Sequence, residues 1–186
     1  KITLGTTPDI IQGFGRIALS NVLPLSGTTV SGFDLFVDEI SMSSYTTMTY
    51  TVTVTANTAP LKASIVWMDP PSDTSSTKLL IHDIDLKVVA PGAVTYYGNE
   101  FAGDEENNVE QVFIPNPSAG TYEVVLTAKN IMLIAGYLNS NSQKVSIIIT
   151  SVGSVSSPSV GTISSTAANF PLNCPSGQSQ VTLLKV

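Results

Sequence analysis

The stretch TTMTYTVTVTA, residues 46–56, decides the fold class. Every second residue from Met48 to Val54 is apolar, and threonine fills the positions between them. Because successive side chains of a strand point to opposite faces, this alternation predicts a strand with one buried face and one hydrated face. Threonine and valine also favour extended backbone, since their branched side chains fit a pleated sheet.

The same alternation recurs on both sides of this stretch. Segments rich in Pro, Gly, Asn and Asp separate the further strands that we predict, at 32–40, 61–68, 83–90, 94–99, 109–115, 120–128 and 144–150. Helical periodicity occurs only in RIALSNVLPL (16–25), which predicts one short N-terminal helix ending at Pro24. Many short strands at this spacing are typical of an all-β fold, so we predict an antiparallel jelly roll or β-sandwich.

The composition restricts the classes of partner. The chain has 186 residues, of which only 12% are charged, and a net charge of −6. A negative surface disfavours nucleic acid and anionic membranes, and no apolar run is long enough to span a bilayer. The uncharged residues that replace the missing charge are Ser, Thr and Asn, which favours a secreted, extracellular β-protein.

The sequence offers little material for catalysis. Its only histidine is His82 and its only cysteine is Cys174, so a Ser-His-Asp triad or a Cys-His pair would depend on a single base. Neither a G-x-S-x-G motif nor a phosphate-binding glycine motif is present. One His and one Cys do not suffice for a structural zinc site. We therefore predict that this chain has no catalytic residues of its own.

Acidic residues gather in one part of the chain. Asp83 and Asp85 lie two residues apart in a predicted strand and should share a face. The segment GDEENNVE (103–110) follows with more carboxylates and amides. Calcium takes six to eight oxygen ligands of these kinds, and the alternative is a hydrated strand face beside a solvated loop. We predict a calcium site formed by Asp83, Asp85, Asp104, Asn107 and Glu110.

The C-terminal part has a different texture. From about Ser151 the chain is rich in Ser, Gly and Thr and almost free of charge, as in a linker. The last residues, VTLLKV (181–186), could form a further strand. Such a strand would pair either with its own sandwich or with that of a neighbouring molecule, which would give self-association.

Two segments of the chain resemble parts of one known family. QGFGRIALSNVLPL (12–25), with Phe14 in place of the usual Trp, resembles the run that closes the catalytic domain of secreted subtilisin-like serine peptidases. Residues 61–130 are similar to the jelly-roll domain that follows it in some alkaline subtilases and, more loosely, to the P domain of proprotein convertases. The matching pieces come in the same order: LKASIVWMDPP, IHDIDLKVVAP, YYGNE, NNVEQVFIP and PSAGTYEVVLT.

The resemblance implies an accessory domain behind a secreted peptidase. Residues 1–26 would be the end of the catalytic domain, 27–150 the jelly roll, and 151–186 a linker with an extra strand. The accessory domain is expected to pack on the catalytic domain and stabilise it, often with calcium. Asp83 and Asp85 match the two aspartates of the family motif N-D-L-D-L, whereas His82 replaces its Asn. The triad would precede Lys1, so we expect a processed piece of a peptidase precursor.

Two other function classes remain open. The low charge and the terminal strand also fit a structural or adhesive module of an extracellular assembly. A carbohydrate-binding module would use exposed aromatic rings, for which Trp67 and Tyr96, Tyr97 and Tyr122 are the candidates. For Trp67, at the end of an alternating strand, a place in the core is the simpler expectation.

Overall fold

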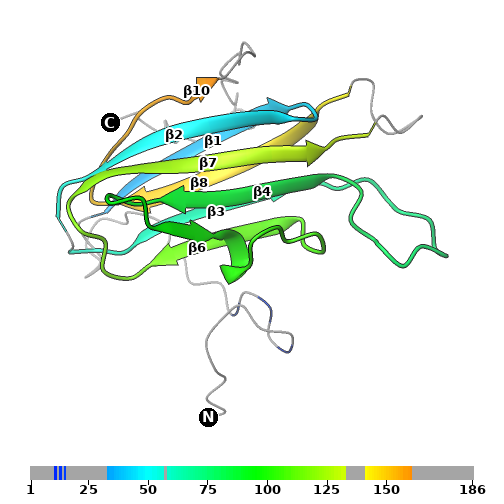
Figure 1. Ribbon diagram of the computed structural model, residues 1–186, viewed down its shortest axis with the longest axis horizontal. Coiled ribbons are helices and arrows are strands. Elements are labelled where there is room, and N and C mark those ends of the chain that lie inside the picture. Colours follow the sequence, from blue (N-terminus) through cyan, green and yellow to red (C-terminus); the bar gives the residue numbers. More distant parts are fainter. Residues whose placement is uncertain are drawn as a thin grey trace, which may run out of the picture.

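The computed structural model describes residues 11, 13, 15, 33–56, 58–132 and 141–160. Within these ranges the chain forms two antiparallel sheets that face each other (Figure 1). The strands are β1 (Asp34–Met42), β2 (Thr46–Val54), β3 (Leu61–Trp67), β4 (Asp83–Val89), β5 (Thr95–Tyr97), β6 (Val109–Ile114), β7 (Gly120–Asn130), β8 (Gln143–Ser151), β9 (Gly153–Val155) and β10 (Ser159–Val160).

The strand order is that of a jelly roll. One sheet has the order β1-β8-β3-β6, and the other has β10-β2-β7-β4-β5 with β9 also on β2. The chain is folded back on itself, because β1 pairs with β8, β2 with β7, β3 with β6, and β4 with β5. The predicted all-β sandwich is therefore confirmed. The helix predicted at 16–25 lies outside the described residues. Within the described residues, the only helical segment is the 3-10 turn η2 (Gly98–Glu100).

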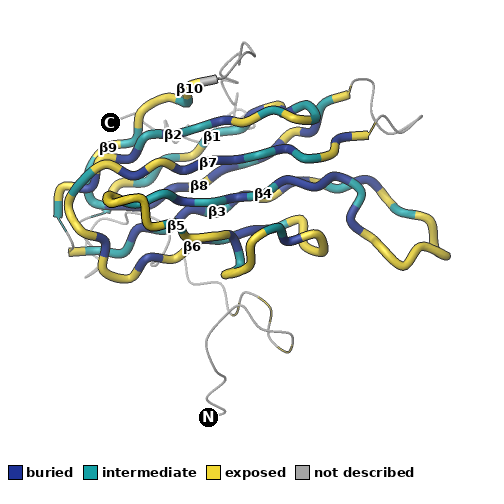
Figure 2. Tube along the Cα trace, in the orientation of Figure 1, coloured by how far each residue is buried: buried dark blue, intermediate teal, exposed yellow. Residues whose placement is uncertain are grey.

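The core lies between the sheets and follows the alternation in the sequence. Along β2 the apolar residues from Met48 to Val54 are buried, while the intervening threonines are partly or fully exposed (Figure 2). Trp67 is also buried, so it is a core residue and not a surface platform for sugars. Burying each such aliphatic or aromatic side chain contributes about 1.5–3 kcal/mol, which makes this core the main source of stability.

The first part of the predicted linker belongs to the sandwich. β9 and β10 both pair with β2 of the same chain. Gly153 has a φ of 144°, and a Cβ there would collide with the carbonyl oxygen of Thr53, so only glycine fits. The Gly153 N–H also donates to Asp34 Oδ2 at 3.0 Å, which ties this segment to β1. Residues 161–186, with the predicted strand 181–186, lie outside the described residues.

One stretch of strand edge is left open by the sheet pairing. β5 covers only residues 87–89 of β4, so the N-terminal half of β4 has no neighbouring strand on that side. Side chains from β6 and from the loop 98–108 approach there instead. Asp83 and Asp85 lie on this part of β4.

Candidate cation site

Asp83 and Asp85 project from the outer face of the second sheet, as the alternation predicts. Ile84, Leu86 and Val88 are the buried, inward-pointing residues of β4. Asp83 is buried although it points outward, and one oxygen of each carboxylate, Oδ1, is buried without a hydrogen-bond partner. Burial, followed by repulsion from Asp85, raises the pKa of Asp83. Asp83 and Asp85 therefore each have a carboxylate oxygen that is free to bind a cation, and the burial of Asp83 disfavours its negative charge.

A β-bulge brings a lysine to these aspartates. Asp83 pairs with Asn130 and Ile84 with Ala128, so Lys129 is the additional residue of β7 at the bulge. Its Nζ lies 2.6 Å from Asp85 Oδ2, and this hydrogen bond raises the pKa of Lys129. Lys129 lies outside the acidic part of the sequence, residues 83–110, so only the strand register shows that it is next to the aspartates.

A second lysine approaches from the long loop between β3 and β4. Lys78 Nζ lies 2.8 Å from Glu105 Oε2, and this pair links the loop 68–82 to the loop 101–108. Both side chains are exposed, so the ion pair contributes little to stability by itself. Asp83 is close enough to add to the rise in the pKa of Lys78. The ammonium groups of Lys78 and Lys129 thus offset part of the negative charge of Asp83, Asp85 and Glu105.

Glu110 reaches the same region from the other sheet. Its side chain is buried, and Oε2 accepts a hydrogen bond of 2.7 Å from the backbone N–H of Leu86, at the open edge of β4. Oε1 has no partner. Burial raises the pKa of Glu110 to about 8, although the hydrogen bond from Leu86 partly opposes this; the charges of Asp85, Asp104 and Asp83 add to the rise. Glu110 is therefore mostly protonated at neutral pH.

Asp104 and Asn107 are engaged with each other and with Asn99. The two oxygens of Asp104 accept from Asn99 Nδ2 and Asn107 Nδ2, both at 2.8 Å, and from the backbone N–H groups of Glu106 and Asn107. Burial alone would raise the pKa of Asp104, but these hydrogen bonds outweigh it and lower the pKa. This network holds the loop 101–108 closed.

Asn99 is a structural residue that the sequence analysis did not single out. It has a φ of 51°, a left-handed conformation that Asn tolerates better than most residues. Its amide donates to Asp104 and to Val109 O, and its Oδ1 accepts from Gln111 N. The signal available in the sequence was Asn directly after Gly98, a pair typical of tight turns.

The five predicted ligands therefore form three groups and not one centre: Asp83 with Asp85, Glu110, and Asp104 with Asn107. Among the described residues, no three His, Cys, Asp or Glu side chains come together as a preformed metal site. The unpaired oxygens of Asp83, Asp85 and Glu110 fit a hard cation, and the Lys129 ammonium already supplies positive charge there. Calcium binding stays a prediction.

His82 has a structural place in the core. It is fully buried, its Nδ1 lies 2.7 Å from Gln143 Oε1, and its Nε2 lies 3.0 Å from Met132 O. The backbone N–H groups of Ile81 and His82 donate to the carboxylate of Asp69, in the segment MDPP. The ring thus connects the residue that precedes β4 to β8 and to the segment that follows β7.

The comparison with known families covers the strands just described. Residues 46–128 match the family model of the bacterial pre-peptidase C-terminal domain. The matched segment runs from the start of β2 to Ala128 in β7 and includes all five predicted ligands. Pre-peptidase C-terminal domains are non-catalytic accessory domains of bacterial peptidases and occur in secreted enzymes. The resemblance to a peptidase accessory domain is thereby confirmed.

A relative with a peptidase in its name agrees with the match to the pre-peptidase C-terminal domain. The "Serine protease/ABC transporter B family protein tagA" of Dictyostelium discoideum is 27% identical over 150 residues. These residues are 72% of this chain but only 8% of that protein. In the described part of the chain, no helix has the length and apolarity needed to cross a membrane.

Proposed function

We propose that this chain is the non-catalytic C-terminal accessory domain of a secreted subtilisin-like serine peptidase and that it stabilises the catalytic domain by packing on it. The observation that carries the proposal is the match of residues 46–128 to the pre-peptidase C-terminal domain. The subtilisin-like type is supported by the resemblance of residues 12–25 to the end of that catalytic domain, and the relative's name includes a serine protease.

The physical basis is mass action within one polypeptide. A domain that binds only the native catalytic domain lowers the free energy of that state. A short connection between the two makes the effective concentration high, so even a weak contact is populated. The accessory domain then changes the lifetime of the peptidase and not the chemistry at its active site.

Removal of the domain from the full gene product tests this proposal. The half-life of peptidase activity at elevated temperature should fall when residues 34–186 are deleted. The kcat/KM for a short peptide substrate, measured at low temperature, should stay unchanged, because the substrate does not contact the sandwich. An upstream polypeptide without a peptidase domain, or an unchanged half-life after deletion, would overturn the proposal.

Calcium is the second part of the proposal. Asp83 and Asp85 would hold the ion through the oxygens that lack a hydrogen-bond partner. Glu110 would have to move toward them to become the third ligand, because this structure does not bring the three carboxyl groups together. Glu110 is mostly protonated at neutral pH, so binding should release a proton and become stronger as the pH rises. Lys129 competes with the ion for Asp85, because its ammonium occupies Oδ2 of that carboxylate.

Melting temperatures measured with EDTA and with added CaCl₂ test the calcium site. Calcium should raise the melting temperature of the wild type, and it should have no effect on the Asp83→Asn/Asp85→Asn variant. Lys129→Met should show a larger calcium-dependent rise, since the competing charge is gone. Lys144→Met is the matched control, because Lys144 pairs with Glu39 on the other sheet. Identical melting temperatures in EDTA and calcium for wild type and Lys129→Met would exclude the site.

The structural or adhesive alternative stays open. It was motivated by the low charge, by the Ser/Thr-rich tail and by the strand predicted at 181–186, which could complete the sheet of a neighbouring molecule. In the described part of that tail, β9 and β10 pair with β2 of their own chain. The strand predicted at 181–186 lies outside the described residues, so strand exchange through it stays a prediction.

A further inference from the structure

The two outer faces of the sandwich differ in chemistry. On the sheet that contains β2, β7 and β4, the outward positions are mostly threonine and charged residues. Its two outward valines, Val89 and Val125, are partly or fully buried by their neighbours. This is the usual chemistry of a sheet face in water. The outward threonines and charged residues are Thr47, Thr49, Thr51, Thr53, Thr121, Thr127, Asp83, Asp85, Lys87, Glu123 and Lys129.

The outer face of the β1-β8-β3-β6 sheet carries more apolar residues, although polar residues lie among them. The uncharged polar residues on this face are Ser41, Ser64, Gln111, Ser146 and Thr150. The strand register places Val37 opposite Ile148 and Val66 opposite Val109 on this face. Phe113 is 53% exposed and Val37 47%, although both could have been polar without disturbing the core. The apolar members are Leu35, Val37, Val66, Val109, Phe113 and Ile148. Leu35, Val37 and Ile148 are neighbours beside the β1 edge, and Val66 and Val109 form a second pair. A group of exposed apolar residues at a sheet edge is a candidate interaction site.

The charged groups on this face are few and largely offset. Lys144 Nζ lies 2.7 Å from Glu39 Oε1 at one edge of the sheet. Lys62 lies 5.4 Å from the centre of the Phe113 ring, where its ammonium is attracted by the ring face. A partner surface that covers this sheet therefore has to match apolar side chains near β1, the polar side chains between them and Phe113, and a single excess positive charge.

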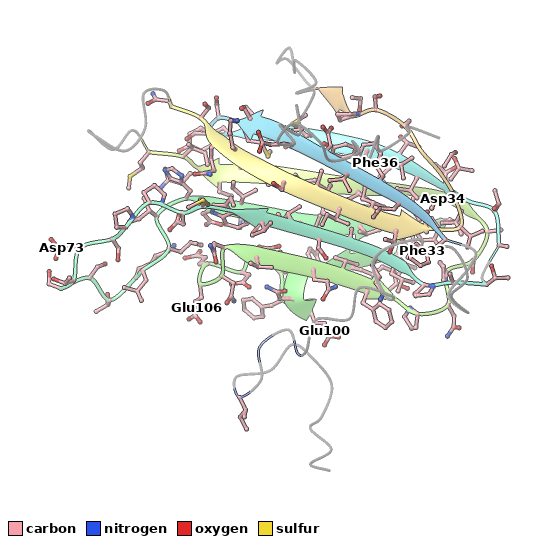
Figure 3. All side chains as sticks on the ribbon, turned by 180° about the vertical axis from the view of Figure 1, so that it is seen from behind. Phe33, Asp34, Phe36, Asp73, Glu100 and Glu106 are labelled. Carbon is pink, nitrogen blue, oxygen red and sulfur yellow. The ribbon has the colours of Figure 1, made fainter. Side chains whose placement is uncertain are left out.

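The course of the chain indicates what covers this face. β1 is both the first described strand and the edge strand of this sheet, and Figure 3, which views the molecule from this side, shows Asp34 at the start of β1. Residues 12–25 resemble the end of a catalytic domain, which leaves the eight residues 26–33 as a connection. Eight residues span at most about 26 Å, and four adjacent strands are about 15 Å wide.

We propose that the outer face of the β1-β8-β3-β6 sheet is the surface that docks on the catalytic domain of the peptidase, with Phe113, Val37 and Ile148 as the buried anchors. This inference rests on the proposed function and specifies the interface of that function. The short connection keeps the end of the catalytic domain within reach of β1, which is the edge strand of this sheet. The threonine-rich face is on the far side of the sandwich, and β9 and β10 cover the free edge of β2.

Matched charge substitutions in the full gene product test the docking face. Val37→Lys/Ile148→Lys adds two charges to the apolar face, and Thr47→Lys/Thr121→Lys adds the same two charges to exposed positions of the other face. We expect the first variant to shorten the half-life of peptidase activity several-fold at elevated temperature, and the second to leave it unchanged. Both substituted 186-residue chains should keep the wild-type melting temperature.

The outcomes separate this inference from the proposed function. If deletion of residues 34–186 shortens the half-life but Val37→Lys/Ile148→Lys does not, the accessory role stands and this face is not the interface. If deletion has no effect, both fail. If the double substitution unfolds the 186-residue chain itself, hydrogen exchange of the unsubstituted proteins tests the docking face instead. Residues 35–39 and 109–113 should then exchange more slowly in the full gene product than in the 186-residue chain, and equal exchange overturns the inference.

Discussion

The buried carboxyl group of Glu110, on β6, accepts the backbone N–H of Leu86, on β4, at 2.7 Å. A side chain from one sheet thereby satisfies the open edge of the other sheet, at the point where β5 no longer covers β4. An unpaired backbone N–H in this buried place would be costly. Glu110 is thus first a structural residue, and any role in ion binding is added to that one.

Glu110 should make the stability of the domain depend on pH. Its pKa rises from 4.5 to about 8 on folding, so the folded state binds the proton more tightly. The stabilising contribution is complete below pH 4.5 and is lost as the pH rises through 8, by about 1.4 kcal/mol for each pKa unit of difference.

We therefore expect the wild-type melting temperature to fall between about pH 5 and pH 9 more steeply than that of Glu110→Gln. The carboxamide keeps an acceptor for Leu86 but cannot ionise. Asp83 contributes a slope of the same sign, which the variant retains. Calorimetry in EDTA checks this, with Glu123→Gln on the exposed face as the control. Parallel curves for wild type and Glu110→Gln would contradict the assignment.

Gly98 should not tolerate a side chain. A Cβ at this position would overlap Glu110 Oε2 and would lie 2.9 Å from Glu110 Cβ. Gly98→Ala is expected to lower the free energy of unfolding by about 2 kcal/mol or more, because the backbone of η2 must move. Gly92→Ala is the control, since its positive φ carries strain but no atom lies within 4 Å of the added Cβ. Urea denaturation that ranks the two variants in the opposite order would refute this.

Asn99 allows backbone strain and hydrogen bonding to be separated. Asn99→Gly loses the three side-chain hydrogen bonds but adopts the left-handed conformation without strain. Asn99→Ala loses the same hydrogen bonds and is also strained in that conformation. We expect both variants to be destabilised, with Asn99→Ala lower by about a further 1 kcal/mol in the free energy of unfolding. Limited proteolysis of the loop 101–108 should accelerate in both. Equal stability of the two variants would show that the backbone at Asn99 relaxes without cost.

His82 should be intolerant of shortening. The substitution His82→Ala leaves the buried Gln143 Oε1 and the carbonyl oxygen of Met132 without their partner and opens a cavity beside β8. The expected loss in the free energy of unfolding is about 2–4 kcal/mol. His82→Asn, the residue of the related motif, should recover part of this because its amide can donate to one of the two oxygens. The exposed neighbour Leu79 serves as the control through Leu79→Ala, which should unfold as the wild type does.

The strands could be predicted because one face of each is buried. The alternation in 46–56 and 61–68 appears in the structure as β2 and β3 with nearly the same limits. β9 and β10 could not be found in this way, since their few residues carry no alternation and depend on the edge of β2. Short edge strands of this kind are defined by tertiary pairing and not by local pattern.

The acidic cluster was predictable only in part. The shared face of Asp83 and Asp85 follows from their spacing, but the burial of Glu110 depends on which strands face each other across the sandwich. Lys129 reaches Asp85 through a bulge that shifts the register between β4 and β7. Such a shift leaves no mark in a single sequence, and so the positive charge beside the aspartates went unnoticed.

The nested pairing of the strands has a consequence for how the domain is made. Of the four nested strand pairs, only β4 and β5 are close together in the sequence. β1 pairs with β8, which is synthesised more than a hundred residues later. Loop-closure entropy makes such distant pairings slow to form. During synthesis the sandwich cannot close until residues 143–160 have left the ribosome. If a catalytic domain precedes the sandwich, as proposed above, it would have emerged completely by then and could fold before the sandwich closes.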